Sequence, residues 1–512
     1  MVTRWIRTLS ARTEGTAETL GGKASGLVQL HRLGLPVPEG FVITTEACRA
    51  FLRDGRLPDG LDAELAAAVA DLERATGRAF GGPRKPLAVS VRSGAGVSMP
   101  GMMDTVLNLG LTIEATEGLA AETGDRPFAQ DARQGFLRSF AAATVTTATG
   151  AAAADPTRPG PDDAARQLTR AVEAVFSSWE SQRARTYREL NGIADDLGTA
   201  VVVQRMVFGN RDAASGSGVA FSRDPNTGED VPYGEVLFGR QGEEVVSGRA
   251  LTRPLRELAE REPQVWSGLL DALHRIEGYY RDACYVEFTF QSGQLWLLQV
   301  RPGRFAGAAA VRVATELVDQ RLIGRDEALL RVSPVHLRHV RTPRIAAGEA
   351  EVLARGIGAC PGVATGRIAT TADGAVRMAR TGPVLLVRPE TSPSDLHGLA
   401  AATGIVTARG GPASHAAVVA RAMGKPAVVG VAGLTLDGGS VTAGGRTLPE
   451  GTPVTIDGTG GEVVLGSPRT VTDAADGHLH RLLAWADEAS GDHSARDEAQ
   501  RLAAAHTALR GR

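Results

Sequence analysis

The chain has 512 residues, of which 43% are hydrophobic and 22% are charged, enough for roughly two to four domains with substantial cores. A formal net charge of -2 argues against the strongly basic face typical of nucleic-acid binding, although local basic sites can exist. No segment reaches the roughly 18 to 20 apolar residues of a membrane span, and the N-terminal segment lacks the apolar core of a signal peptide. We therefore expect a cytoplasmic globular protein with no nucleic-acid or membrane partner.

Strands that alternate with helical patterns, separated by Gly and Pro turns, indicate an α/β multidomain chain. Cys48, Cys284 and Cys360 are isolated and form no C-x-x-C pair, so neither a disulfide framework nor a zinc site is expected. They are expected to be buried thiols or spectators.

The N-terminal part of the chain holds two candidate phosphate-binding residues. Lys23 follows two glycines and precedes an apolar helical pattern, as in a flexible loop that delivers a lysine to phosphates; a surface lysine is the alternative. Arg92 stands at the end of the strand "LAVSV", where glycines open a turn with backbone N–H donors; an ordinary arginine after a strand is the alternative. Further along, the small residues of 141–163 indicate a loop.

Two β-rich segments near 285–301 indicate a hairpin that could bind a metal and phosphates. If its loop has three residues, Glu287 faces Gln299, and the period of two puts Arg301 on the same face as Gln299. A carboxylate, an amide and a guanidinium could then bind Mg²⁺ and nucleotide phosphates. A two-residue loop would shift the pairing by one residue, and a solvated sheet face is the alternative.

Changes in composition divide the rest of the chain into three parts. After a first zone over 1–340, residues 341–355 form a candidate linker. Short Val- and Ile-rich strands fill 356–467 and end in a predicted hairpin, "TPVTIDGTGGEVVLG". The polar residues of 468–512 predict a helical tail.

The segment "GGPASHAAVVARAMGKPAVVG" sets a histidine at the start of a predicted helix. A strand over 404–408 precedes it, Ser414 is a suitable N-cap for a helix over 415–423, and Gly424 ends that helix. The N-terminus of a helix disfavours imidazolium and binds phosphate, so a neutral His415 could act as a nucleophile toward phosphoryl groups. A histidine that only caps or packs the turn is the alternative.

These segments resemble the pyruvate phosphate dikinase family. "TARGGPASHAAVVARAMGKPAVVG" is similar to its phosphohistidine motif. Six further segments resemble its nucleotide-binding region in the same order: "SVRSGAGVSMPGMMDTVLNLGL", "AVFSSWESQRARTYREL", "GTAVVVQRMVFGN", "GVAFSRDPNTGE", "YGEVLFGRQGEEVVSG" and "EFTFQSGQLWLLQVR". The resemblance implies an ATP-grasp-like nucleotide-binding module followed by a swivelling β/β/α phosphohistidine domain.

The resemblance also implies an activity and a set of site residues. ATP with Mg²⁺ would give its β-phosphoryl group to His415 and leave as AMP, while the γ-phosphate passes to inorganic phosphate as pyrophosphate. Glu287 would bind the nucleotide and the metal. The implied nucleotide and phosphate ligands are Lys23, Arg92, Glu287, Gln299 and Arg301.

Around these ligands the resemblance is less specific. "RPETSPSDLHGL" would shape the edge of the histidine domain or be structural, through Arg388, Glu390, Thr391 and Asp395. Gly101, Met102 and Met103 would cover the nucleotide or line the core. The family resemblance suggests a homodimer.

The sequence departs from the family pattern at several places. Family members continue into a barrel that binds pyruvate, and the chain ends about where that barrel begins, so the acceptor site is expected to be missing. Tyr285 stands where the family has a metal-binding aspartate, with Asp282 out of register. Gln134 and Gly135 replace a basic pair, which weighs against inorganic phosphate as a co-substrate. Ala413 replaces a regulatory threonine.

Three functions are compatible with these observations. The first is a phosphotransferase that works with a separate barrel-domain protein and transfers the phosphoryl group to pyruvate. The second is a relative that uses a different small-molecule acceptor. The third is a nucleotide-binding regulatory protein without turnover, a reading that Tyr285 favours and the intact His415 motif disfavours.

Overall fold

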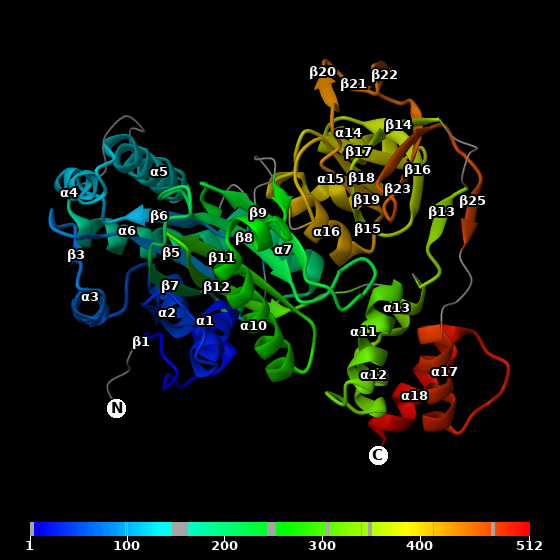
Figure 1. Ribbon diagram of the computed structural model, residues 1–512, viewed down its shortest axis with the longest axis horizontal. Helices are drawn as coiled ribbons and strands as arrows, with labels where there is room; N and C mark the ends of the chain where they lie inside the picture. Colours follow the sequence, from blue (N-terminus) through cyan, green and yellow to red (C-terminus); the bar gives the residue numbers. More distant parts are fainter. Residues whose placement is uncertain are drawn as a thin grey trace. The chain divides into compact units, whose positions relative to one another are not determined.

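The computed structural model describes residues 5–97, 99, 101–145, 162–242, 252–303, 305, 307–338, 340–346, 351–412, 414–472 and 477–511 (Figure 1). Contacts divide the chain into two units. Unit 1 comprises Met1–Ser215 and Thr289–Val300, and unit 2 comprises Gly216–Phe288 and Arg301–Arg512. Among the described helices, none combines the length and the apolar content needed to cross a bilayer.

Unit 1 is built on an antiparallel sheet with the order β1-β2-β7-β5-β6. Its strands are β1 (Ile6–Thr8), β2 (Gly40–Ile43), β7 (Ala200–Arg205), β5 (Val89–Gly94) and β6 (Thr105–Leu109). Its α-helices are α1 (Ala17–Arg32), α2 (Thr45–Asp54), α3 (Leu61–Thr76), α4 (Ile113–Thr123), α5 (Arg126–Val145), α6 (Ala164–Ser177) and α7 (Gln182–Asn191). One apolar core of unit 1 joins the apolar faces of α2, α3, α5 and α6 to the sheet.

A predicted loop in this unit is partly helical. Residues 141–145 of the stretch 141–163 continue α5, since alanine and valine extend its apolar pattern, and 146–161 lie outside the described residues. Gln134 and Gly135 lie within the same helix.

A second sheet in the chain has the order β10-β9-β8-β11-β12. Its strands are β8 (Gly216–Phe221), β9 (Tyr233–Phe238), β10 (Arg253–Pro254), β11 (Cys284–Gln291) and β12 (Gln294–Pro302), and α9 (Glu257–Arg261) and α10 (Pro263–Tyr280) lie between β10 and β11 in the sequence. Residues 289–300 at the tip of the β11–β12 hairpin belong to unit 1, and the base of the hairpin belongs to unit 2.

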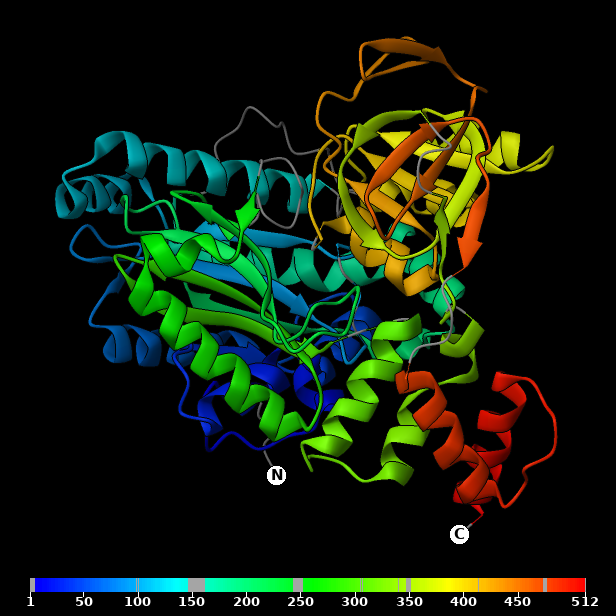
Figure 2. The same cartoon turned by 45° about the vertical axis from the view of Figure 1, so that its right-hand side comes forward.

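Five helices distant in sequence form one cluster in unit 2. Figures 1 and 2 show the C-terminal helices beside the helices that follow β12, and one continuous apolar core joins them. The helices are α11 (Gly307–Asp319), α12 (Arg325–Arg331), α13 (Pro334–Arg338), α17 (Gly477–Ser490) and α18 (Glu498–Arg510). Within the predicted helical tail of 468–512, residues 477–490 and 498–510 are helical, whereas residues 470–472 form a strand.

The segment with His415 is built on an eight-stranded sheet in the order β14-β24-β23-β16-β17-β18-β19-β15. The four central strands, β16 to β19, are parallel to one another. The strands on either side of these four pair in antiparallel fashion. The strands are β14 (Val352–Arg355), β15 (Ile357–Cys360), β16 (Val363–Ala369), β17 (Val384–Arg388), β18 (Gly404–Thr407), β19 (Ala427–Val429), β23 (Pro453–Asp457) and β24 (Glu462–Leu465). The predicted terminal hairpin is β23–β24.

Three helices and a small sheet complete this segment. They are α14 (Ala372–Ala379), α15 (Leu396–Ala401) and α16 (His415–Met423), with β20 (Thr435–Asp437), β21 (Ser440–Ala443) and β22 (Arg446–Pro449).

The two connections of this segment pair with each other. β13 (Pro343–Ile345) lies in the candidate linker, and it forms an antiparallel ribbon with β25 (Thr470–Thr472), which follows β24. Both connections therefore leave the segment as one two-stranded ribbon.

Candidate active site

His415 stands at the first position of α16, in a strand–turn–helix–strand unit. β18 ends at Thr407, α16 runs over His415–Met423, and Gly424 closes the helix with a left-handed φ of 63°. The predicted helix boundaries are confirmed. Ser414 occupies the N-cap position with extended backbone, but its hydroxyl makes no capping bond. The N-terminal N–H groups of the helix are therefore not capped by that side chain.

The two ring nitrogens of His415 have different surroundings. Nδ1 lies 3.1 Å from the Thr391 hydroxyl oxygen. Nε2 is buried and has no hydrogen-bond partner among the described residues, and the same holds for the Ser414 hydroxyl. Two unpartnered polar atoms thus lie at the start of one helix, the arrangement expected where an anion or a reacting group binds.

The charge state of His415 follows from its burial. Burial lowers its pKa to about 4, against a smaller opposing effect of the Asp395 carboxylate. Removing the ring from water disfavours imidazolium, and a helix N-terminus adds to that effect. The imidazole is therefore neutral near pH 7, which leaves a lone pair on one nitrogen.

The loop that follows β17 supports Thr391 beside the histidine. Asp395 closes a capping box with Ser392, and its carboxylate lies 3.4 Å from the Arg388 guanidinium. Glu390 pairs with Arg409 at 3.2 Å. Of the four residues predicted for this edge, Thr391 contacts the histidine, and the other three take part in ion pairs that brace the loop.

The sequence analysis did not single out Arg421, which braces the histidine loop from the same helix. Its guanidinium donates to the Ala359 carbonyl at 2.9 Å and to the Pro412 carbonyl, just before the histidine. Burial lowers the pKa of Arg421. A lone charge in the apolar run "HAAVVARAM" was the available signal, because a charged residue on a buried helix needs partners.

Ala413, which replaces the threonine of the family pattern, lies outside the described residues.

In unit 1, Lys23 lies in a helix and not in a flexible loop, which corrects the prediction. α1 is kinked at Gly21, whose φ is 74°, and the helix continues through Lys23 to Arg32. The kink brings Gly21 onto the Gly94 carbonyl, and the Gly22 N–H donates to the Ala95 carbonyl at 2.9 Å. These glycine contacts hold the backbone next to Lys23 beside the end of β5.

Arg92 lies within β5, whose pairing with β7 continues to Gly94, so the turn begins later than predicted. Its guanidinium donates to the Gln204 side-chain oxygen and to the Leu298 carbonyl, the latter at 3.3 Å. Unit 1 therefore brings Arg92 beside the strand residue that precedes Gln299. Gln204 gave no signal in the sequence, because only the β5–β7 register places it opposite Ser90, next to Arg92.

The hairpin loop has two residues, Ser292 and Gly293, and not three. Their φ values of 49° and 76° fit a type I′ turn, which matches the twist of the flanking strands. The prediction that Glu287 faces Gln299 assumed a three-residue loop. A two-residue loop shifts the pairing by one residue, so the loop no longer supports that prediction.

At the base of the hairpin, Tyr285 contacts two of the predicted ligands. The Arg301 guanidinium carbon lies 4.2 Å from the centre of the Tyr285 ring. The Tyr285 hydroxyl lies 3.4 Å from a Glu287 carboxylate oxygen. Asp282, the other acidic residue nearby, lies 3.6 Å from the Arg331 guanidinium.

These residues fit Mg²⁺ only in a site that the nucleotide completes. The described residues contain no group of three or more His, Cys, Asp or Glu side chains that could hold a metal ion. Mg²⁺ is commonly held by one or two carboxylates together with substrate phosphates and water. Glu287 could supply one carboxylate to such a site.

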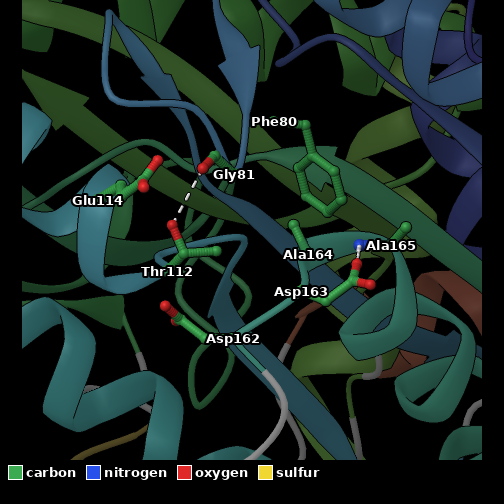
Figure 3. A pocket seen from close by; sticks show the side chains of 8 residues that line it. All are labelled: Phe80, Gly81, Thr112, Glu114, Asp162, Asp163, Ala164 and Ala165. Atoms are coloured by element: carbon green, nitrogen blue, oxygen red, sulfur yellow. Dashed lines mark hydrogen bonds between the residues drawn. The ribbon is translucent and has the colours of Figure 1, made fainter.

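Unit 1 also contains a cavity of about 340 Å³, whose acidic lining does not suit a phosphate group (Figure 3). Thr112 donates to the Gly81 carbonyl at its wall, and the Asp163 carboxylate caps α6 through the Ala165 N–H. Its charged lining residues are Glu114, Asp162 and Asp163. Carboxylates repel phosphates, and the cavity contains none of the predicted ligands.

Two motifs of the nucleotide-binding region have packing roles. Met102 is fully buried in an apolar cluster with Met99 and Trp179. Of the two roles considered for this segment, covering the nucleotide or lining the core, the position of Met102 fits the second. The Arg223 side chain, in "GVAFSRDPNTGE", is fully buried and lies 2.7 Å from Glu277 and 2.8 Å from Glu316. The three cysteines are buried free thiols.

Comparison with known proteins defines the class of the chain. The pyruvate phosphate dikinase AMP/ATP-binding domain matches residues 17–75 and 53–253, and the mobile domain of PEP-utilising enzymes matches 381–461. The chain is therefore a mixed α/β protein with a nucleotide-binding domain followed by a mobile phosphohistidine-type domain.

Three curated relatives specify the family. The chain is 42% identical to pyruvate, phosphate dikinase 2 of Zea mays, 38% identical to the pyruvate, phosphate dikinase of Rhizobium meliloti and 37% identical to the pyruvate, phosphate dikinase of Clostridium symbiosum. These alignments cover 92%, 94% and 95% of this chain and 58%, 60% and 60% of the relatives. The chain belongs to the pyruvate phosphate dikinase family and spans about three fifths of the length of these relatives.

Proposed function

We propose that the chain transfers the β-phosphoryl group of ATP to Nε2 of His415. The state of the imidazole carries the proposal. Burial keeps it neutral, Nδ1 faces the Thr391 hydroxyl, and Nε2 is buried without a partner at a helix N-terminus. A proton on Nδ1 that is donated to Thr391 would leave the lone pair on Nε2, the atom free to attack.

In the proposed step, Nε2 forms a bond to the β-phosphorus. The bond from that phosphorus to the oxygen shared with the α-phosphate breaks, and AMP leaves with that oxygen. The γ group then passes to inorganic phosphate as pyrophosphate, or to water. Phosphoryl transfer depends more on positioning and charge stabilisation than on covalent catalysis. The lysine, the arginines and Mg²⁺ that would surround the phosphates are therefore expected to contribute most to the rate.

We assign the nucleotide ligands from the sequence and from their placement within each unit. Lys23, Arg92 and Gln299 would bind the phosphates, and Arg92 lies beside the strand that carries Gln299. Glu287 and Arg301, which both contact Tyr285, are assigned as ligands from the sequence. Mg²⁺, when bound by Glu287 and the nucleotide, would offset the charge of the phosphates.

The phosphohistidine would then meet an acceptor elsewhere. We propose that 356–467, together with β14 of the same sheet, swivels on the part of the linker 341–355 that precedes β14, where the β13–β25 ribbon joins both ends of the segment to the rest of unit 2. The acceptor is pyruvate or another small molecule, bound by a partner protein or a further domain. A homodimer and a cytoplasmic location belong to the same proposal.

The test follows each phosphate of ATP separately. The chain is incubated with Mg²⁺ and ATP labelled at the β- or the γ-phosphate, with and without inorganic phosphate, beside His415→Ala. We expect β label on the protein, γ label in pyrophosphate or phosphate, AMP as the nucleotide product, and none of these with His415→Ala. ADP formation without protein label would contradict the proposal. ATP binding without turnover would instead favour the regulatory function.

A further inference from the structure

We propose that Tyr285 is a positioning residue that holds Arg301 and Glu287 in place for the nucleotide. This inference rests on the proposed function, since it concerns the same phosphate-binding residues. It assigns a role to a side chain that the sequence analysis treated only as the loss of a carboxylate.

The Tyr285 ring has a fixed orientation. It is 2% exposed and belongs to an apolar cluster with Val219, Phe221 and Leu237. It meets the Phe221 ring edge to face, with centroids 5.0 Å apart. Because the ring is packed on a neighbouring strand, it presents a stable surface to the groups that lie against it.

Arg301 lies against that surface. Its guanidinium carbon is 4.2 Å from the ring centre, within the range of a cation–π interaction. Within the described residues, Arg301 forms no ion pair with a carboxylate. A neutral ring therefore restricts the guanidinium without neutralising it. An acidic side chain in contact with Arg301 would pair with it and compete with a phosphate for its charge.

The Tyr285 hydroxyl contacts Glu287, the second of the two predicted ligands. It lies 3.4 Å from a Glu287 carboxylate oxygen, to which it donates a long hydrogen bond. A phenylalanine would fill the apolar cluster equally well, so packing does not account for the hydroxyl. One side chain thus contacts the anionic and the cationic ligand at the base of the hairpin, the ring fixing Arg301 and the hydroxyl fixing Glu287.

The experiment measures ATP binding by calorimetry, first in EDTA and then across a Mg²⁺ titration. Tyr285→Leu removes the ring and the hydroxyl, and Tyr285→Phe removes the hydroxyl alone. Tyr233→Phe is the matched control, because Tyr233 packs on the same cluster but, among the described residues, forms no hydrogen bond or ring contact with Arg301 or Glu287. Melting temperatures of all variants report on folding.

Two effects are expected. Tyr285→Leu weakens metal-free ATP binding about 3- to 30-fold, the range of a partly desolvated cation–π contact. Tyr285→Phe leaves metal-free binding within about twofold, since the ring remains, and raises the Mg²⁺ concentration needed for half-maximal enhancement. Tyr233→Phe changes neither quantity.

A double-mutant cycle separates positioning from general damage. In an Arg301→Ala background, Tyr285→Leu should cause no further loss of metal-free binding, because the residue it positions is gone. An equal loss in both backgrounds, or wild-type binding by Tyr285→Leu and Tyr285→Phe, would overturn the inference. Absence of ATP binding by the unmodified chain would overturn the proposed function together with it, a distinct result.

Discussion

The Thr391 hydroxyl oxygen and Nδ1 of His415 lie 3.1 Å apart, although one follows β17 and the other begins α16. The contact fixes the orientation of the ring, and it leaves Nε2 as the nitrogen without a partner among the described residues. In the proposed function, a side chain 24 residues away in the sequence would thereby decide which nitrogen attacks.

Thr391→Val should slow the phosphorylation of His415 by ATP about tenfold, the value of one lost hydrogen bond of roughly 1.4 kcal/mol. Valine keeps the shape of threonine but cannot accept a hydrogen bond from the N–H of Nδ1. Thr391→Ser, which keeps the hydroxyl, is the matched control and should restore most of the rate. Rapid-quench measurement of the phosphoenzyme gives both rates, and a Thr391→Val rate equal to wild type would show that the contact does not orient the ring.

The low pKa of His415 predicts a pH-dependent stability. The pKa is about 4 in the folded chain and about 6.5 when unfolded. Between these values the unfolded state binds more protons, so stability rises with pH, and lowering the pH from 7.5 to 5 costs about 2 kcal/mol at this residue. Urea unfolding at both pH values should show this loss in wild type but not in His415→Gln. Equal losses in the two proteins would refute the assigned burial effect.

The kink in α1 predicts a sharp difference between adjacent glycines. A Cβ on Gly21 would lie 1.5 Å from the Gly94 carbonyl oxygen, at a φ of 74°. Gly21→Ala must therefore displace the helix that carries Lys23, and it should cost about 3 kcal/mol or more in folding free energy and weaken ATP binding. In Gly22→Ala, the nearest atom would lie at 3.3 Å, so the change should be far smaller. Thermal unfolding and ATP calorimetry compare the two variants.

The buried Arg223 predicts a large stability effect of Arg223→Met. Its guanidinium contacts Glu277 and Glu316, and methionine would leave the Glu277 charge buried without its main partner. Breaking a buried pair from one side costs about 3 to 5 kcal/mol. Arg312 pairs with the same Glu316 but is 30% exposed, so Arg312→Met should cost no more than about 1 kcal/mol. Chemical denaturation measures both, and equal costs would contradict the buried-pair account.

The environment of His415 was the most predictable part of the site. Glycines on both sides of a nine-residue apolar run fixed the start and the end of α16, because each local signal agrees with the others. The strands on either side of α16 could be predicted for the same reason. Local signals could also place Arg92 on a strand, but not the residue on which that strand ends, since the pairing of β5 with β7 decides it.

The partners of the site residues could not be read from the sequence. Gln204 meets Arg92 across 112 residues, and Arg421 reaches the Ala359 carbonyl across 62. Such contacts depend on sheet order and helix packing, which no local pattern encodes. The hairpin loop is a different case, because Ser-Gly marks a turn and two-residue loops are the commonest hairpin connections, so weighting that preference would have corrected the predicted register.

Intact mass analysis tests most directly whether His415 accepts a phosphoryl group from ATP, as proposed. The chain is mixed with ATP and Mg²⁺, and its mass is recorded before and after brief acid treatment, beside His415→Ala. We expect the added mass of one phosphoryl group, lost in acid, absent from His415→Ala and accompanied by AMP. An unchanged mass with no AMP, in a chain that still binds ATP, would contradict this proposal.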